Sequence, residues 1–276
     1  MLQALVLGVV QGATEFLPVS SSAHLVLVPW VLGWEFNPQA AFIFDVLVQL
    51  GTLLAVVVYF ARDLWRLLTA AARGLSRGRP WAETDARLAW LLLLATLPAA
   101  AAGVLAKDWV EAAFSSPAAV AGFLLVTAGL LLLAERQRAA DRVLPRLTPL
   151  DALWIGLAQA LALFPGISRS GSTIAGGRMR HLSRPEAAHF SFLMAVPVMI
   201  GAGLVASGGL VGLPAAGALI APLTLGFLAA AASGYLAIRW LLRYLARRPL
   251  TPFAVYCGLL GLAMLLLSLL RAGGLG

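Results

Sequence analysis

The stretch Ala41–Phe60 reads AFIFDVLVQLGTLLAVVVYF, and its length decides the class of fold. A helix needs about 20 mostly apolar residues to cross about 30 Å of hydrocarbon. Leu88–Ala106 and Phe253–Leu270 are runs of similar length and character. The chain is therefore predicted to be all-α, a polytopic bundle of membrane-spanning helices.

Composition supports this prediction. The 276 residues are 61% hydrophobic and 12% charged, with a mean hydropathy of +0.91, which leaves too few polar residues to cover a water-soluble surface. The formal net charge of +8 does not indicate nucleic acid, because the cations sit in short segments between apolar runs. The single cysteine, Cys257, excludes an intramolecular disulfide and a cysteine-based zinc site.

Hydropathy predicts the number and direction of the spans. We expect one membrane domain over residues 1–276 with six transmembrane helices near 42–60, 88–106, 118–134, 188–206, 219–238 and 252–270. The loops after the first, third and fifth spans hold the arginines, namely Arg62, Arg66, Arg73, Arg77, Arg79 and Arg87, then Arg136, Arg138, Arg142 and Arg146, then Arg239, Arg243, Arg247 and Arg248. These loops should be cytoplasmic, which places both termini outside.

Two further segments, 2–35 and 150–184, consist of short apolar stretches interrupted by proline and serine. Each half is too short to cross the membrane, so each segment is predicted to be a re-entrant helix pair. Such a broken backbone is tolerated at membrane depth only where protein or a wet cavity surrounds it.

The two segments resemble each other. A shift of 148 residues superposes six pairs of identical residues, namely Gly8 and Gly156, Gln11 and Gln159, Phe16 and Phe164, Ser20 and Ser168, Ser22 and Ser170, and Phe42 and Phe190. We therefore expect internal repeats over about 1–135 and 150–276. Each repeat holds one re-entrant pair and three crossings, and this odd number makes the repeats inverted, with the two tips meeting near the membrane midplane.

The tips carry the polar residues that a membrane segment rarely tolerates without a function. The first offers Gln11, Glu15, Ser20, Ser21, Ser22 and His24, and the second offers Ser168, Arg169, Ser170 and Thr173. An arginine among serines and glycines at a helix start suits phosphate, because guanidinium donors, free N–H groups and the helix dipole all favour an anion.

The other tip supplies candidates for chemistry. Ser21 or His24 could serve as nucleophile or proton carrier, and Glu15 could hold a divalent cation or position His24. The serines and threonines could instead satisfy neighbouring backbone. Asp45 and Gln49, four residues apart in the first span, could line the same cavity or pair with another helix.

Two of these motifs resemble the signatures of a known family. Residues 11–24, QGATEFLPVSSSAH, and 165–173, PGISRSGST, are similar to the two motifs of bacterial undecaprenyl-diphosphatases of the bacitracin-resistance type. Residues 44–51 and 186–197 are also similar, so the resemblance covers nearly the whole chain.

The resemblance implies a phosphatase of the bacterial inner membrane that converts undecaprenyl pyrophosphate into undecaprenyl phosphate for cell-wall synthesis, assisted by Mg²⁺ or Ca²⁺. It implies catalytic roles for Glu15, Arg169 and either Ser21 or His24, with Glu15 as the metal ligand. The substrate-binding residues would be Gln11, Ser20, Ser22, Ser168, Ser170 and Thr173. The family motif often has a glutamate where this chain has Gln11, and an amide is not a base.

Several expectations follow. The site should open to the outer face, and Arg169→Ala and His24→Ala should abolish turnover. Small residues such as Gly176 and Gly201 permit close helix contact, either within the chain or across a homodimer. A transporter or flippase of an anionic lipid is the main alternative, because inverted repeats with broken helices are typical of transporters. An intramembrane serine protease is the more distant one, since an arginine has no evident use there.

Overall fold

The structure is a computed structural model that describes residues 1–137, 141–210 and 217–273. Within these ranges every regular element is helical. Six helices are long and apolar enough to cross a membrane, namely α3 (Pro38–Tyr59), α5 (Thr84–Leu105), α7 (Pro117–Glu135), α10 (Arg184–Leu210), α11 (Gly217–Leu245) and α12 (Thr251–Gly273). The predicted all-α bundle with six spans is confirmed. Arg138 and residues 211–216 of the predicted outer loop lie outside the described ranges.

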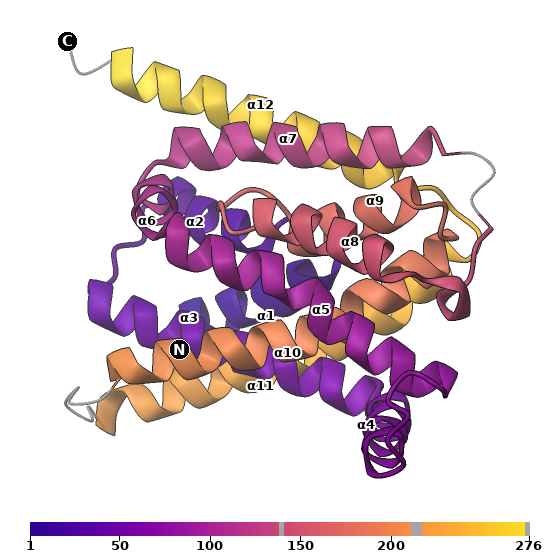
Figure 1. The fold of residues 1–276 in the computed structure, drawn as a ribbon. Coiled ribbons are helices and arrows are strands. Elements are labelled where there is room, and N and C mark those ends of the chain that lie inside the picture. Colours follow the sequence, from indigo (N-terminus) through magenta and orange to yellow (C-terminus); the bar gives the residue numbers. More distant parts are fainter. Residues whose placement is uncertain (138–140, 211–216, 274–276) are drawn as a thin grey trace.

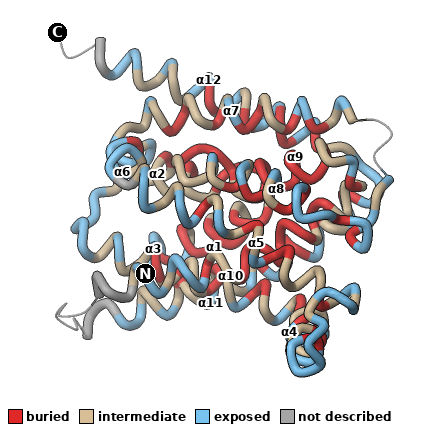
Figure 2. Tube along the Cα trace, in the orientation of Figure 1, coloured by how far each residue is buried: buried red, intermediate tan, exposed pale blue. Residues whose placement is uncertain are grey.

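Four shorter helices occupy the middle of the bundle. They are α1 (Leu2–Phe16), α2 (Ser21–Leu32), α8 (Pro149–Leu161) and α9 (Arg169–Met179). The α1–α2 pair and the α8–α9 pair run in from opposite ends and turn between the long helices (Figure 1). Buried residues concentrate on these central helices, whereas the outer faces of α11 and α12 are largely exposed, as lipid-facing surfaces would be (Figure 2).

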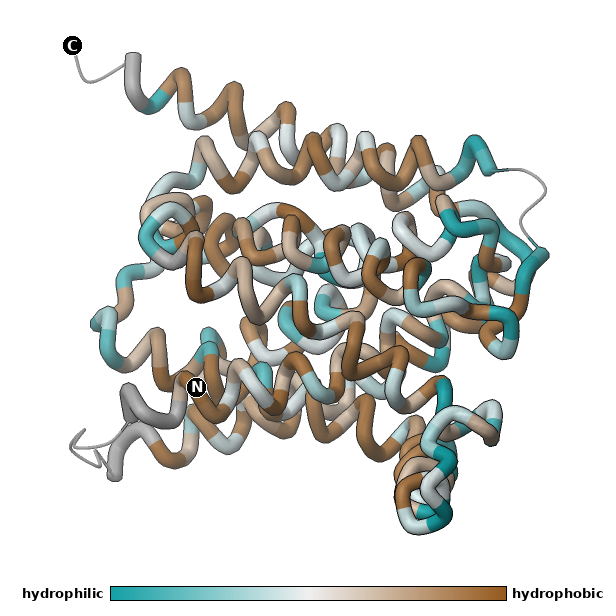
Figure 3. Tube along the Cα trace, viewed as in Figure 1, coloured by the Kyte–Doolittle hydropathy of each residue, from teal (hydrophilic) through white to brown (hydrophobic). Residues whose placement is uncertain are grey.

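Polar residues gather at one end of the bundle, around α4 (Ala61–Ser76) and the connection between α7 and α8 (Figure 3). Ion pairs join the elements there. Glu135 at the end of α7 pairs with Arg184 at the start of α10 and accepts a hydrogen bond from Leu250 N just before α12. Asp151, fully buried, pairs with Arg180 at 2.6 Å. These contacts anchor the ends of three long helices and of α8.

Two helices were not predicted. α4 and α6 (Lys107–Phe114) fall in segments expected to be loops. Three arginines, at 62, 66 and 73, keep the hydropathy of α4 far below that of a span, yet they leave an apolar stripe on which Leu67 and Ala70 are buried. A hydropathy window long enough to detect a span averages this stripe away.

Glycines allow the central helices to approach the long ones closely. A Cβ atom on Gly8 of α1 would lie 2.5 Å from the carbonyl oxygen of Gly226 in α11, and one on Gly156 of α8 would collide with the carbonyl oxygen of Ala95 in α5. Gly176 also packs inside the chain, against Ala158, whereas Gly201 faces open space. Backbone contact of this kind is how small residues hold membrane helices together.

Gly8→Ala is therefore expected to lower the melting temperature of the detergent-solubilised protein. The new methyl group meets backbone atoms of α11 that cannot move aside, and overpacking of this kind costs about 1–3 kcal/mol. Gly122→Ala is the matched control, because a Cβ there meets nothing within 4 Å. Equal melting temperatures for the two variants would contradict this α1–α11 contact.

Candidate active site

The two central turns touch each other. Gly166 N, just before α9, donates to Ser22 Oγ at 3.4 Å, and Ser170 Oγ donates to the carbonyl oxygen of Leu17 at 2.9 Å. Thr127 of α7 supports the second turn, donating to Gly166 O at 2.9 Å and accepting from Ser168 N at 2.9 Å. The residues that the sequence marks as functional in two distant segments therefore come together.

Glu15 is the centre of this contact. Its Oε1 lies 2.9 Å from Arg169 Nη2. Its Oε2 accepts hydrogen bonds from Ser21 Oγ at 2.6 Å and from Gln11 Nε2 at 3.0 Å. The Glu15 carboxylate thus holds the Arg169 guanidinium and the Ser21 hydroxyl side by side. A short O–H···O⁻ hydrogen bond is the geometry from which a hydroxyl can lose its proton.

Two helices begin at this point. Ser20 caps α2 by accepting from Ala23 N at 3.4 Å, and Ser168 caps α9 by accepting from Gly171 N at 3.0 Å. The first N–H groups of a helix have no intrahelical partner, and the dipole makes that end positive. Arg169 is the first residue of α9, and together with the two helix starts it forms a region suited to an anion such as phosphate.

The site opens onto a cavity of about 240 Å³. Its polar lining comprises Glu15, Ser20, Ser21, Ser22, Gln49, Gln159, Ser168 and Arg169. Its apolar wall includes Phe114 of α6 and Val198 and Ala202 of α10. Only 14% of the Arg169 side chain and 8% of the Glu15 side chain are exposed, so the ion pair is largely shielded from solvent.

Not every predicted binding residue faces this cavity. Ser170 and Thr173 are fully buried, and the Thr173 hydroxyl donates to Arg169 O at 2.7 Å and lies 2.7 Å from Ser191 Oγ. Ser191 O also accepts from Arg169 Nη1 at 3.4 Å. Ser170 and Thr173 therefore hold the backbone and the start of α9, the supporting role that the sequence left open for such residues.

His24 forms its hydrogen bonds outside the Glu15–Arg169 pair. Its Nδ1 donates to the carbonyl oxygen of Ser20 at 2.7 Å, which leaves Nε2 to accept from the Tyr256 hydroxyl at 2.7 Å. Its ring stacks on that of Tyr256, and His24 is absent from the cavity lining. The structure thus brings Ser21 to Glu15 and His24 to Tyr256.

The backbone of Ser20 explains this arrangement. Ser20 has φ 69°, a left-handed conformation that residues other than glycine seldom adopt. This conformation directs its carbonyl oxygen to His24 Nδ1 while its side chain caps α2. Strained backbone of this kind persists where surrounding contacts maintain it, and it is concentrated at functional sites.

Comparison with known proteins identifies the family. The model of the family described as bacitracin resistance protein BacA matches residues 4–263. The chain belongs to the BacA family. Three relatives bear the name undecaprenyl-diphosphatase. That of Myxococcus xanthus is 44% identical, covering 100% of this chain and 91% of its own. That of Rubrobacter xylanophilus is 48% identical, over 93% of this chain and 94% of its own length. That of Desulforudis audaxviator is 42% identical, over 98% of each chain.

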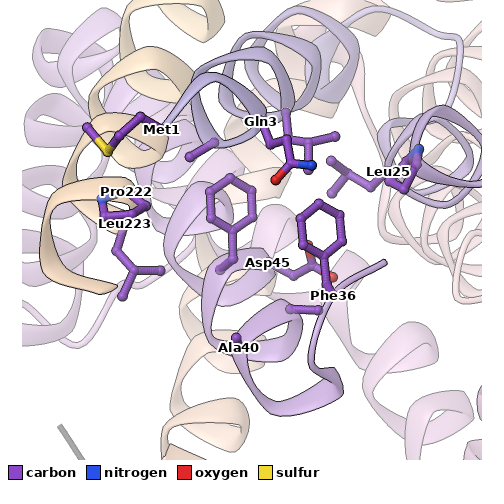
Figure 4. A pocket seen from close by; sticks show the side chains of 13 residues that line it. Met1, Gln3, Leu25, Phe36, Ala40, Asp45, Pro222 and Leu223 are labelled. Atoms are coloured by element: carbon purple, nitrogen blue, oxygen red, sulfur yellow. The ribbon is translucent and has the colours of Figure 1, made fainter. Parts of the chain in front are cut away.

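In this BacA-family protein Asp45 and Gln49 line two different cavities. Gln49 lines the active-site cavity. Asp45 lines a second, mostly apolar cavity with Met1, Gln3 and Phe36, beside the start of α11 (Figure 4). The expectation that the two could share one cavity is wrong, because about 6 Å of helix separates them along α3 and Asp45 lies nearer to the N-terminal start of this helix.

Three residues at this site, Tyr256, Ser191 and Gln159, do not belong to the two sequence motifs. Tyr256 lies inside an apolar span and has no local pattern that marks it. Ser191 lies within the family-like run 186–197, which is the one signal that could have drawn attention to it. Gln159 is different, because the predicted repeat pairs it with Gln11, a signal that could have found it. Among the described residues no cluster of three or more His, Cys, Asp or Glu side chains could hold a metal ion, so a cation here would rest on Glu15 and on oxygens of the substrate.

Proposed function

We propose that this protein hydrolyses the terminal phosphate of undecaprenyl pyrophosphate, the activity that the names of its BacA-family relatives state. The observation that carries the proposal is the Glu15 carboxylate, which holds Arg169 at 2.9 Å and the Ser21 hydroxyl at 2.6 Å where two helices begin. This arrangement combines an anion-binding region with an activated nucleophile.

The first chemical step uses Ser21. Arg169 binds non-bridging oxygens of the terminal phosphate, Ser21 Oγ attacks its phosphorus, and the hydroxyl proton passes to Glu15 Oε2. The bond from phosphorus to the bridging oxygen breaks, so undecaprenyl phosphate leaves and phospho-Ser21 remains. Water then attacks the same phosphorus, releasing inorganic phosphate and restoring Ser21. We favour Ser21 over His24 because Ser21 lines the cavity, whereas both ring nitrogens of His24 are engaged elsewhere.

Mg²⁺ or Ca²⁺ remains part of this proposal. Oxygen ligands suit both ions, and Mg²⁺ is commonly held by one or two carboxylates together with substrate phosphates. Glu15 fits that pattern, with Ser21 as a neutral oxygen beside it. A bound cation would neutralise charge on the pyrophosphate, and Arg169 already performs part of that task.

We further propose inverted repeats whose tips form the site, opening to the outer face of the bacterial inner membrane. Gly8 and Gly156, equivalent in the repeat, both pack on a long helix of the other half, which supports the repeat. The cavity wall includes Phe114 of α6, at the end of the bundle opposite the arginine-rich connections, which supports an outward opening. A homodimer through exposed small residues such as Gly201 is part of the same proposal.

The test is phosphate release from a long-chain prenyl pyrophosphate by purified protein in detergent, with and without Mg²⁺ or Ca²⁺. We expect release of one inorganic phosphate per prenyl monophosphate formed. A well-folded protein that binds the substrate but releases no phosphate would favour the flippase alternative. Reconstitution in vesicles with the labelled lipid in one leaflet would then detect transport.

A further inference from the structure

The wall of the active-site cavity contains a polar group that the reaction described so far does not use. Gln159 is in the last turn of α8, and only 2% of it is exposed. It lines the cavity with Glu15, Ser21 and Arg169. Neither its Nε2 nor its Oε1 has a hydrogen-bond partner in the described part of the chain.

A buried amide without partners is costly. Leaving a buried donor or acceptor unsatisfied costs about 1–3 kcal/mol, and native proteins satisfy nearly all such groups. The repeat shows what distinguishes Gln159 from its counterpart. Gln11 donates to Glu15 four residues later, whereas four residues after Gln159 the chain has Leu163, which cannot accept. The amide of Gln159 therefore remains available to a ligand in the cavity.

The chemistry of the amide limits what that ligand can be. Gln159 presents a donor and an acceptor together. A phosphate oxygen can accept from Nε2, but an ionised phosphate has no proton to donate to Oε1. A water molecule can donate to Oε1, so a phosphoryl group and a water bound together satisfy both atoms.

We infer that Gln159 orients the water that hydrolyses phospho-Ser21. This inference rests on the proposed phosphatase function. Oε1 of Gln159 accepts a hydrogen bond from the attacking water, which orients a lone pair of the water oxygen toward phosphorus. Nε2 of Gln159 donates to a phosphoryl oxygen. The water oxygen forms the new bond to phosphorus, and the bond from phosphorus to Ser21 Oγ breaks. Ser21 Oγ takes back the proton that Glu15 gained in the first step, and the water proton passes to the released phosphate or to the Glu15 carboxylate that is thereby freed. Gln159 thus serves the second step of the reaction and not the first.

The test is Gln159→Leu, which keeps a similar volume and removes both polar atoms. We expect a rapid first turnover, in which about one prenyl monophosphate per protein is released, followed by steady-state phosphate release about 10²-fold slower than in the unaltered protein. Phosphate from a substrate labelled on its terminal phosphorus should accumulate on Ser21. Gln39→Leu, at the exposed start of α3, is the matched control and should show neither change.

Two further measurements make the result decisive. Without substrate, Gln159→Leu should melt no lower than the unaltered protein, because it removes an unsatisfied buried group, whereas a purely structural glutamine would give a lower melting temperature. Gln159→Asn, which retains a shorter amide, should recover part of the rate.

The outcomes separate this inference from the proposed function. Turnover of Gln159→Leu close to normal, or slow turnover without phosphoprotein, would overturn the role of Gln159 while leaving the phosphatase intact. Absence of phosphate release from the unaltered protein would instead refute the phosphatase itself.

Discussion

Arg169→Ala is expected to lower phosphate release by about 10³-fold or more. Arg169 is the cation of the site, and its guanidinium can bind two phosphate oxygens at once. Removing one preorganised donor from a transition-state site commonly costs 10²–10³-fold, and here the positive charge is lost as well. The effect should appear in kcat as well as in KM, because charge develops on the leaving phosphate as the bond breaks.

Removing Arg169 also leaves the Glu15 carboxylate buried without its ion-pair partner, so folding must be checked. Arg169→Lys is the matched variant, because it keeps the charge but loses the paired donors. We expect it to recover part of the rate and most of the melting temperature. Normal turnover by a folded Arg169→Ala protein would show that the phosphate binds elsewhere.

Ser21→Ala is expected to abolish phosphate release and covalent labelling together. The variant retains Glu15 and Arg169 but has no oxygen to attack phosphorus. Its residual rate should be at least about 10³-fold below that of the unaltered protein. Rapid quenching with a substrate labelled on the terminal phosphate, followed by acid treatment, provides the measurement, because phosphoserine survives acid and phosphohistidine does not.

His24→Ala is the informative comparison. The sequence alone predicts complete loss for this variant, but His24 contacts Ser20 O and Tyr256 and does not line the cavity. We therefore expect the variant to form phospho-Ser21 at a reduced rate, because the strained Ser20 turn loses its support. Acid-labile label that disappears in His24→Ala and persists in Ser21→Ala would assign the nucleophile to His24 instead.

The helical class and the six spans followed from the sequence because hydrocarbon thickness sets a length that each segment must meet by itself. No knowledge of neighbouring helices is needed to recognise Ala41–Phe60 as long enough to cross. The same reasoning missed α4, whose stability depends on burying Leu67 and Ala70 against another helix. Motif resemblance likewise marked Glu15, Arg169 and the pair of candidates Ser21 and His24.

Contacts between those residues could not be deduced in the same way. Glu15 and Arg169 are 154 positions apart, and only the packing of both central turns between the long helices brings them to 2.9 Å. Ser21 and His24 are three residues apart, yet the Ser21 hydroxyl bonds to Glu15 at 2.6 Å whereas His24 bonds to Ser20 O and to Tyr256, a difference that no local pattern shows. Segment length and residue chemistry are local properties that a sequence carries by itself. The orientation and pairing of polar groups arise from packing across the whole bundle, and tertiary structure alone decided them.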